Sequence, residues 1–301
     1  MKRRIIYFIN PISGTSVKSA LIIKIEEKTT LQGIPFEILY TNAEGNYQFL
    51  KEKILREQIT DIVICGGDGT VSKIAGSLLK ENVNIGIIPM GSGNGLALAA
   101  KIPTKIESAL DIIFKGNASS IDSFTINGNF SCMLCGLGFD AQVAHDFSKQ
   151  SSRGLLTYIK QTIINFIRMR PWNFEINYGG QSVHTSAFFI SIANSNQFGN
   201  QFTIAPKASL TDGLLDIVVV KKMPKYRFLW SVLKQVLNGK LKDYDESSFH
   251  KEEVLYFQTN RLTIKNIDAA PLHIDGDPWN TSSEFKIEVI PNAFKLLLAG
   301  I

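Results

Sequence analysis

The sequence predicts an α/β domain built on a parallel sheet, followed by an all-β domain of the sandwich type. Over the first 120 residues, short apolar runs alternate with longer helical patterns, as in sheets whose helices connect parallel strands. From Ser119 onward, short β-like runs and two-residue glycine turns predominate, which is typical of antiparallel sandwiches. We therefore expect one domain over residues 1–120 and a second over 121–301, with the last strand a candidate to return to the first domain.

The first half begins with Ile5–Ile9, a continuous apolar run that Asn10-Pro11 ends, as expected for a strand buried on both faces. The following elements are predicted from the same alternation. We expect further strands at Phe36–Tyr40, Asp61–Cys65 and Ile85–Ile88, and helices at Ser16–Gln32, Tyr47–Glu57, Val71–Lys80, Leu96–Ala100 and Ile106–Lys115. In such sheets ligands bind beyond the carboxyl ends of the strands, which is where the glycine-rich runs of this half lie.

The second half contains short strand patterns separated by turns. Asn127-Gly128 and Gly179-Gly180 predict two-residue hairpins. The predicted strands are Ser120–Ile126, Phe130–Cys135, Trp172–Tyr178, Ser186–Ala193, Leu215–Val220, Val254–Thr259, Arg261–Lys265 and Phe285–Ile290. Two helical stretches, about Leu155–Met169 and Phe228–Leu237, interrupt them.

Composition narrows the class of partner. The 301 residues include 32 Lys and Arg against 27 Asp and Glu, a net charge of +5. This mild excess suits an anionic small ligand or an anionic membrane surface, and we expect no nucleic-acid partner. The three cysteines Cys65, Cys132 and Cys135 are too sparse for a disulfide scaffold and favour buried, reduced thiols.

No apolar run approaches the roughly 18 residues needed to span a bilayer. The basic start, Met1–Arg4, is followed by an apolar stretch too short for a signal peptide. We therefore expect a cytoplasmic protein that is peripheral at the inner membrane face.

The run Gly66-Gly67-Asp68-Gly69-Thr70 lies between a predicted strand and a predicted helix. Glycines permit close backbone approach, and N–H groups converge at a helix N-terminus, so the run suits a phosphate cradle. Asp68 repels a bare phosphate, but it is chemically sensible if it holds Mg²⁺ or takes a proton from an attacking hydroxyl. The alternative is an ordinary glycine turn.

Two further loops follow neighbouring strands of the same sheet, Asn10-Pro11-Ile12-Ser13-Gly14 and Gly91-Ser92-Gly93-Asn94-Gly95. Three such loops at one sheet edge indicate a nucleotide site. The chain has neither a G-x-x-x-x-G-K-[ST] run nor a G-x-G-x-x-G after its first strand, which excludes a P-loop ATPase and a standard dinucleotide fold.

In this order and spacing, Asn-Pro-x-Ser-Gly, Gly-Gly-Asp-Gly-Thr and Gly-Ser-Gly-Asn-x-Leu-Ala resemble the diacylglycerol kinase/sphingosine kinase family of lipid kinases. The resemblance runs the full chain. It includes the segments Gly136–Asp140, Asp212–Asp216 and Ile274–Pro278. It implies an N-terminal nucleotide domain related to those of NAD kinases and phosphofructokinases, a lipid-binding β-sandwich, and transfer of a phosphoryl group from ATP to a lipid alcohol.

Residue by residue, the resemblance implies ATP contacts in both halves of the chain. The implied residues are Asn10, Pro11, Ile12, Ser13, Gly14, Thr41, Gly66, Gly67, Asp68, Gly69, Thr70, Ser92, Gly93, Asn94, Arg153, Asp275 and Gly276. The family's proposed general base, the acid of Asp-Gly-Glu, falls on Asp277. Because Asp replaces Glu there and shortens the reach by one methylene, Asp68 and Asp277 both remain candidates; a plain β-turn Asp before Pro278 is the alternative.

The resemblance also implies an acceptor site and a structural metal. Asp140 matches the position at which sphingosine kinases contact the lipid head group, and Arg153 matches a phosphate-binding arginine that could also be a solvated loop residue. Ser209, Asp212 and Leu214 match a structural Mg²⁺ site, a set of few hard oxygen donors of the kind that magnesium accepts; a turn aspartate without metal is the alternative.

A lipid substrate requires contact with a bilayer. Lys221–Lys242 contains seven Lys or Arg, no acid and interleaved aromatics, and it is the first candidate for an anionic membrane surface; residues 153–172 are the second. Helices packed on the sandwich are the alternative for both. A homodimer is compatible with the family.

Three functions remain open. The first is a kinase of diacylglycerol, a sphingoid base or a related lipid alcohol, and Gly-Ser-Gly-Asn together with the Asp140–Arg153 spacing is closer to the sphingosine kinase side. The second is a kinase of a soluble acceptor such as NAD. The third is a catalytically weak lipid-binding relative, suggested only by Asp at position 277.

Overall fold

The computed structural model describes residues 2–11, 13, 18–42, 44–150, 155–197, 205–227 and 253–299. The chain divides into two compact units. Unit 1 comprises Met1–Ser123, Gly199–Gln201 and Ile290–Ile301, and unit 2 comprises Phe124–Phe198 and Phe202–Val289. The chain thus passes into unit 2 after Ser123, and its last segment, from Ile290, belongs to unit 1 again.

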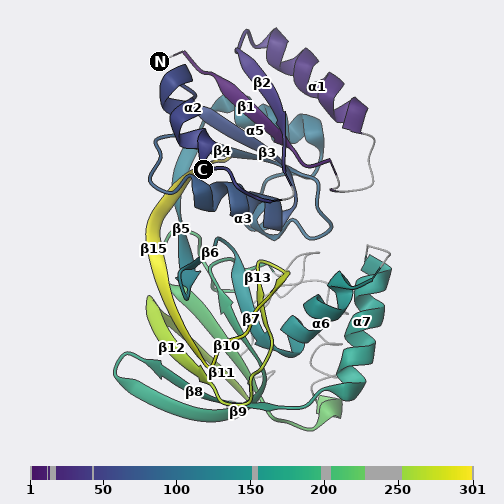
Figure 1. Ribbon diagram of the computed structural model, residues 1–301, viewed down its shortest axis with the longest axis vertical. Helices are drawn as coiled ribbons and strands as arrows, with labels where there is room; N and C mark the ends of the chain where they lie inside the picture. The colour runs from purple at the N-terminus through teal and green to yellow at the C-terminus, as the bar shows by residue number, and fades with distance from the viewer. Residues whose placement is uncertain are drawn as a thin grey trace. The chain divides into compact units, whose positions relative to one another are not determined.

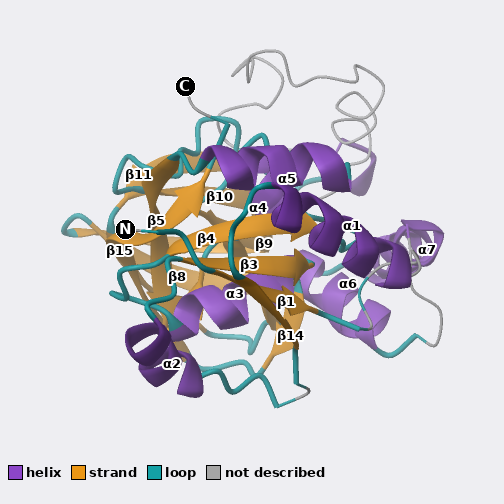
Figure 2. Ribbon diagram, turned by 90° about the horizontal axis from the view of Figure 1, so that it is seen from above, coloured by secondary structure: helices purple, strands orange, loops and turns teal. Residues whose placement is uncertain are grey.

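Unit 1 is a parallel α/β sheet, as predicted. Its strands β1 (Ile5–Ile9), β2 (Phe36–Tyr40), β3 (Asp61–Gly66) and β4 (Asn84–Pro89) pair in the order β2-β1-β3-β4, and the end of β15 (Glu284–Leu297) lies parallel to β4. The helices are α1 (Lys18–Leu31), α2 (Phe49–Glu57), α3 (Asp68–Ser77), α4 (Gly95–Ala99) and α5 (Ile106–Lys115). Figure 2 shows α1 and α5 on one face of the strands and α2 and α3 on the other.

Burial explains the apolar runs of this sheet. Every residue of β1 and β3 is buried, whereas β2, at the edge, is mostly half-buried. An inner strand covered by helices on both faces needs apolar side chains on both, and this is why its sequence is continuous rather than alternating.

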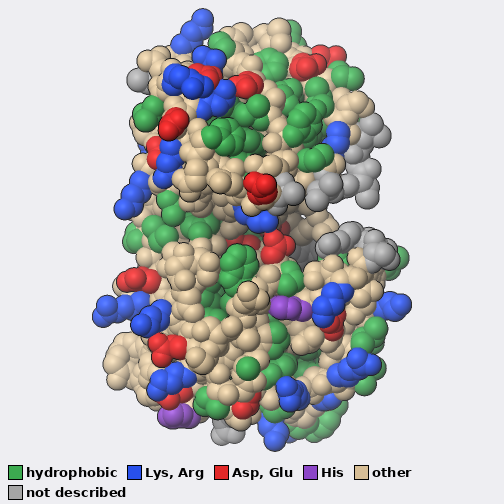
Figure 3. Space-filling view, viewed as in Figure 1, with side chains coloured by type: hydrophobic (Ala, Val, Ile, Leu, Met, Phe, Trp, Pro, Cys, Tyr) green, Lys and Arg blue, Asp and Glu red, His purple; other side chains and the backbone are tan. Residues whose placement is uncertain are grey.

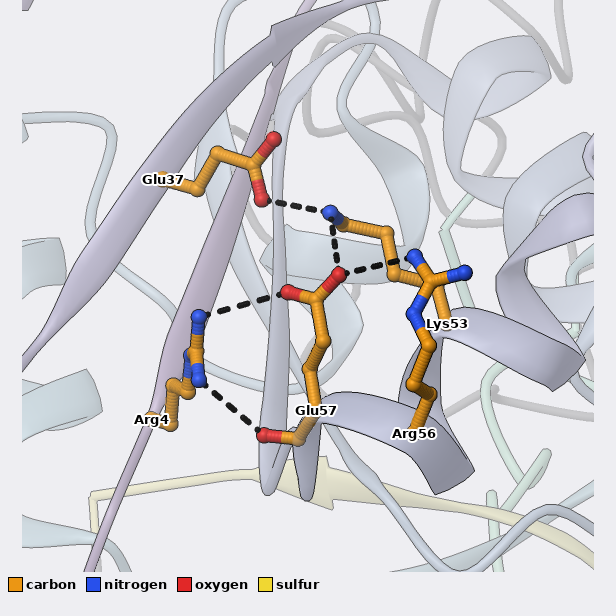
Figure 4. Close-up of polar contacts among 5 residues, drawn as sticks. All are labelled: Arg4, Glu37, Lys53, Arg56 and Glu57. Carbon is orange, nitrogen blue, oxygen red and sulfur yellow. Dashed lines mark hydrogen bonds and ion pairs between the residues drawn. The ribbon is translucent and has the colours of Figure 1, made fainter.

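The amino-terminal edge of this sheet carries an ion-pair network (Figure 4). Lys53 of α2 lies 2.8 Å from Glu37 of β2 and 3.0 Å from Glu57. Glu57 also pairs with Arg56 at 3.0 Å and with Arg4 at 3.3 Å. Hydrogen bonds from Lys53 and Arg56 lower the pKa of Glu57. The network ties α2 to the strands at the edge opposite the glycine loops.

Unit 2 is an antiparallel sheet with two helices (Figure 1). Its strands are β5 (Ala118–Ile126, which begins in unit 1), β6 (Asn129–Ser131), β7 (Leu134–Gly138), β8 (Trp172–Tyr178), β9 (Gln181–Ala193), β10 (Leu215–Lys221), β11 (Val254–Thr259), β12 (Arg261–Asn266), β13 (Leu272–Ile274) and β14 (Asp277–Trp279). They pair in the order β15-β12-β8-β9-β7-β13-β14; β10 pairs with β9 and β11, and β5 with β6.

Both predicted hairpins are confirmed, since β5–β6 turn at Asn127-Gly128 and β8–β9 at Gly179-Gly180, all with positive φ. Helix α7 (Leu155–Arg168) is also confirmed, and the predicted helix at 228–237 lies outside the described residues. Helix α6 (Phe139–Ser148) was not predicted. It follows β7 directly through Gly138, whose φ of 100° is open to glycine alone, so no polar loop marks the junction.

The three cysteines are buried and form no disulfide, as predicted. Burial, with the charges of Asp275 and Asp140 next, raises the pKa of the Cys135 thiol well above its usual value. None of the described helices is long and apolar enough to cross a bilayer.

Candidate active site

The three glycine loops of unit 1 meet at the carboxyl edge of its sheet. The backbone N–H of Asn10 donates to Cys65 at 3.0 Å, that of Met90 donates to Gly66 at 2.9 Å, and that of Thr41 donates to Ile9 at 3.0 Å. Each residue that leaves a strand is therefore held by the neighbouring strand. Register alone therefore brings Asn10, Thr41 and Met90, the residues that follow β1, β2 and β4, to one edge of the sheet.

Side chains join the first loop to the second. The Asn10 amide donates from Nδ2 to the Thr70 hydroxyl at 2.8 Å. Gly66 leaves room for this contact, because a Cβ there would lie 2.9 Å from the Cβ of Thr70. Of the other predicted residues in the first loop, Pro11 is exposed and Ser13 half-buried; Ile12 and Gly14 lie outside the described residues.

Asp68 joins the second loop to the third. Its carboxylate accepts hydrogen bonds from the first two amides of α4, Oδ2 from Gly95 at 3.0 Å and Oδ1 from Leu96 at 3.3 Å. The side chain is half-buried at the start of α3. Asp68 thus has a defined structural task, which its position in the sequence did not indicate.

The third loop approaches the second by backbone alone. A Cβ on Gly91 would lie 2.6 Å from the Cα of Gly67, so no side chain fits between the loops. Asn94, at φ 52°, closes the turn by accepting from Gly91 N–H and donating to Gly91 C=O, both at 2.7 Å. Ser92 is exposed and Gly93 half-buried. Between Gly67 and Gly91 the two loops thus meet by backbone without an intervening side chain, which suits close approach of a phosphate chain.

Lys18 is a candidate that the sequence interpretation missed. Its ammonium donates to the Ser13 carbonyl in the first loop, and burial lowers its pKa. It is the first residue of α1, and no sequence pattern there distinguishes such a lysine from a solvated one.

In unit 2, Asp140 and His273 form a buried pair. They are 7% and 1% exposed. Gly276 N–H donates to His273 Nδ1 at 3.3 Å, which leaves Nε2 as the protonated nitrogen of the neutral ring; Nε2 donates to Asp140 Oδ2, also at 3.3 Å. The other oxygen of Asp140 accepts from Ala141 N–H at 2.8 Å.

Gly136 makes this pair possible. A Cβ on Gly136 would overlap the Asp140 carboxylate and lie 2.5 Å from His273 Nε2. The charge of Asp140 also reaches α7, since burial first and Asp140 second raise the pKa of Tyr158 to about 12. The sequence interpretation used Asp140 but missed His273; its place two residues before Asp275 was the available signal.

Asp275 is buried, and its carboxylate holds the β6–β7 connection by hydrogen bonds. Its carboxylate accepts four hydrogen bonds, from the Ser131 hydroxyl at 2.7 Å and from the amides of Cys132, Met133 and Leu134 at 3.3, 3.1 and 3.1 Å. These donors form the β6–β7 connection. At φ 48°, Asp275 starts the turn that carries the following two residues.

The turn presents Asp277 to solvent. Gly276, at φ 84°, and Asp277, the first residue of β14, are both exposed. Asp275 and Asp277 therefore differ in environment although one residue separates them. The buried carboxylate organises the turn, and the exposed one is available for chemistry.

The predicted magnesium donors lie on one turn. Asp212 is exposed, and its Oδ1 accepts from Leu214 N–H at 3.1 Å; the Ser209 hydroxyl accepts from Thr211 N–H at 3.3 Å. Four residues after Asp212, Asp216 is fully buried, and burial raises its pKa, with the charge of Asp212 adding to the effect. Among the described residues no group of three or more His, Cys, Asp or Glu forms a metal site.

One carboxylate with backbone oxygens is a small set of ligands. It suits a Mg²⁺ ion that keeps most of its waters, and it does not suit a metal site enclosed by protein ligands. The predicted metal role of Ser209, Asp212 and Leu214 stays a prediction. Arg153 lies outside the described residues.

Comparison with known proteins decides the family. Residues 4–126 match the diacylglycerol kinase catalytic domain, and residues 134–298 match the YegS C-terminal NAD kinase beta sandwich-like domain. The chain belongs to the diacylglycerol kinase/YegS family of lipid kinases. Its two family domains fall on the parallel sheet of unit 1 and the antiparallel sheet of unit 2.

Relatives of this lipid kinase family member span nearly its whole length. It is 26% identical over 283 residues to a diacylglycerol kinase of Bacillus subtilis, covering 92% of this chain and 90% of the relative. It is 23% identical over 280 residues to a diacylglycerol kinase of Staphylococcus carnosus, covering 92% and 88%. A crystal structure titled as a diacylglycerol kinase of Bacillus anthracis matches with a TM-score of 0.76 at 19% identity, covering 99% and 97%, which shows a shared fold.

Proposed function

We propose that the chain transfers the γ-phosphoryl group of ATP to the hydroxyl of diacylglycerol or a related neutral lipid alcohol. The observation that carries the proposal is the side-chain-free approach of Gly91 to Gly67, with Asp68 and Asn94 holding the loops. The triphosphate would lie along this edge of unit 1, near Asn10, Thr70 and Lys18.

Mg²⁺, when bound with ATP, supplies neutralisation of the phosphate charge. The chain's own residues then have three tasks. The glycine loops orient the triphosphate, Asp68 keeps α4 and the second loop in register, and Asp277 takes the proton as the lipid oxygen bonds to the γ-phosphorus and ADP leaves. We assign the proton to Asp277 because Asp68 already accepts two backbone N–H groups, whereas Asp277 is exposed.

Asp140 bears on the acceptor. An ammonium head group, as on a sphingoid base, would favour a carboxylate with free acceptor capacity facing it. The carboxylate of Asp140 is buried and bonded through both oxygens, to Ala141 N–H and to His273. This environment supports a neutral acceptor over a sphingoid base, and the names of the curated relatives point the same way.

An acceptor panel tests the proposal. The chain is incubated with Mg²⁺-ATP and diacylglycerol, monoacylglycerol, ceramide, sphingosine or NAD, and products are identified by mass spectrometry. Phosphatidic acid as the main product is expected. Phosphorylated sphingosine as the main product would overturn the choice of acceptor, phosphorylated NAD alone would overturn the lipid assignment, and no product from any acceptor would favour a catalytically weak lipid-binding relative.

A further inference from the structure

The turn that carries Asp277 is a two-residue hairpin between β13 and β14. Asp275 and Gly276, its two central residues, have φ of 48° and 84°. The backbone N–H of Asp275 donates to the Leu134 carbonyl of β7 at 2.9 Å. The backbone N–H of Gly276 donates to Nδ1 of His273 at 3.3 Å. Each turn amide is therefore bonded outside the turn, one to a neighbouring strand and the other to an imidazole ring.

Asp140 fixes the orientation of that ring. Its Oδ2 accepts from Nε2 of His273 at 3.3 Å, and its Oδ1 accepts from Ala141 N–H at 2.8 Å, at the start of α6. A half-turn of the imidazole about its bond to Cβ would exchange nitrogen and carbon positions and break both ring bonds inside a buried site. The ring therefore has one favoured orientation, which aims Nδ1 at Gly276.

Helix α6 holds β13 at two consecutive residues. Nε2 of His145 donates to the Leu272 carbonyl at 2.8 Å, and the second hold is the bond between Asp140 and His273. A line of bonds thus leads from α6 through His273 to the Gly276 amide, one residue before the exposed carboxylate. Because a glycine backbone is the least restricted of all, a bond to this amide limits the turn more than a bond elsewhere would.

Asp140 and His273 lie beneath the surface of unit 2. They are 7% and 1% exposed. The visible face gives no comparable signal, because acidic, basic and apolar side chains are interspersed over unit 2 in Figure 3. Side chains with so little exposed surface act on a substrate through the groups that they hold, and the exposed group held here is the turn with Asp277.

We propose that His273 is a positioning residue for phosphoryl transfer, which fixes the backbone of Gly276 and thereby the place of the Asp277 carboxylate. Asp140 then serves the reaction by orienting His273. The proposal rests on the proposed function, in which Asp277 takes the proton of the acceptor hydroxyl. An aspartate has two side-chain torsions, so its carboxylate follows the backbone closely. A misplacement of about 1 Å can cost about 100-fold in rate.

Two substitutions separate the two bonds of the ring. His273→Asn places a side-chain carbonyl close to the position of Nδ1, where it accepts from Gly276 N–H, and it does not reach Asp140. His273→Gln places its NH₂ group close to the position of Nε2, where it donates to Asp140 and leaves Gly276 N–H without this acceptor. Both variants remove the imidazole and keep an amide in the buried site, so they are matched. His184→Gln, at an exposed histidine of β9, is the control for loss of an imidazole elsewhere.

Phosphatidic acid formation from diacylglycerol and Mg²⁺-ATP is the first readout. His273→Gln should lose about tenfold or more in kcat/KM for diacylglycerol, whereas His273→Asn and His184→Gln should stay within about threefold of wild type. The KM for ATP should be unchanged in all three variants, because the loops proposed for the triphosphate are untouched. A purely structural role of His273 predicts instead equal losses in the Asn and Gln variants.

Hydrogen exchange at the Gly276 amide, followed by NMR, is a readout that does not depend on activity. Exchange should be about tenfold or more faster in His273→Gln than in wild type, and close to wild type in His273→Asn. If His273→Gln fails to fold, His273→Leu, which has a similar shape and accepts no hydrogen bond, takes its place with the same expectations.

Equal activity of the Asn and Gln variants, or equal exchange of Gly276 in wild type and His273→Gln, would overturn the proposal and leave the proposed function standing. A wild type that forms no phosphatidic acid would overturn both.

Discussion

Two carboxylates, Asp68 in unit 1 and Asp275 in unit 2, hold comparable turns by opposite means. Asp68 is half-buried, and its carboxylate accepts hydrogen bonds from two backbone amides of another loop. The glycine backbone beside Asp68 is left accessible to a ligand. Asp275 is 5% exposed and accepts four donors, and the residue it presents to solvent is Asp277. The loops of unit 1 expose backbone, while the turn of unit 2 exposes a side chain.

The difference indicates a division of labour. Exposed backbone at glycine suits a phosphate chain, which needs close approach and N–H groups. An exposed carboxylate on a fixed turn suits proton transfer, which needs a base at a defined position. Under the proposed function, unit 1 would bind the phosphoryl donor, and unit 2 would carry the base for the acceptor hydroxyl.

The largest expected effect on stability comes from disrupting the hydrogen bonds that the buried Asp275 carboxylate accepts. Asp275→Asn should lower the free energy of unfolding by about 4 kcal/mol, because it replaces a charged acceptor of four hydrogen bonds with an amide whose NH₂ group faces donors. Urea unfolding measures the change. Asp277→Asn is the matched control one turn residue away, and it should stay within about 0.5 kcal/mol of wild type. Similar losses in both variants would contradict the contrast between the two residues.

Two alanine substitutions sharpen the division between donor and acceptor. Gly91→Ala forces the third loop away from Gly67, so the KM for ATP should rise while that for lipid changes little. Gly136→Ala pushes on Asp140 and His273, so the KM for lipid should rise instead. Each overpacked site should also cost about 1–3 kcal/mol of stability. Steady-state kinetics with each substrate varied in turn gives the comparison, and the same shift pattern in both variants would refute it.

The smallest effect concerns the ion pairs of the two units. Hydrogen bonds from Lys53 and Arg56 lower the pKa of Glu57 in unit 1, and bonds from Lys265 and Asn177 lower that of Glu175 in unit 2. A lowered pKa in the folded state stabilises the fold above the unfolded value of 4.5, and the stabilisation is lost as pH falls through the folded pKa.

Glu57→Gln should therefore be less stable than wild type near neutral pH, and the gap should close as pH falls well below 4.5. Glu175→Gln should show the same dependence with a smaller gap, because one cation rather than three surrounds that carboxylate. Urea unfolding across this pH range tests both variants, and a gap independent of pH would show that the ion pairs are not its cause.

Much of unit 1 was predictable because its strands and loops are determined by residues that are close together in the sequence. A short continuous apolar run such as Ile5–Ile9, ended by Asn10-Pro11, favours a strand buried on both faces, and the glycines after β1, β3 and β4 mark the edge where the loops meet. The hydrogen-bond partners of the Asp68 carboxylate could not be predicted from the sequence. Its two partners, Gly95 and Leu96, come from a loop 27 residues further on.

Unit 2 was less predictable because its key contacts are long-range. Helix α6 follows β7 without a polar linker, so the segment after Gly138 carries no start signal. The partners of Asp275 lie more than 140 residues away, and the pairing of His273 with Asp140 spans 133. Such contacts depend on strand order, which a single sequence does not specify.

The most direct test of the account is the amount of phosphatidic acid that wild type, Asp277→Asn and Asp277→Glu form from diacylglycerol and Mg²⁺-ATP. The account predicts product from wild type, at least about 100-fold less from Asp277→Asn at an unchanged unfolding midpoint, and retained turnover in Asp277→Glu, which keeps the carboxylate. Equal product from wild type and Asp277→Asn would contradict it.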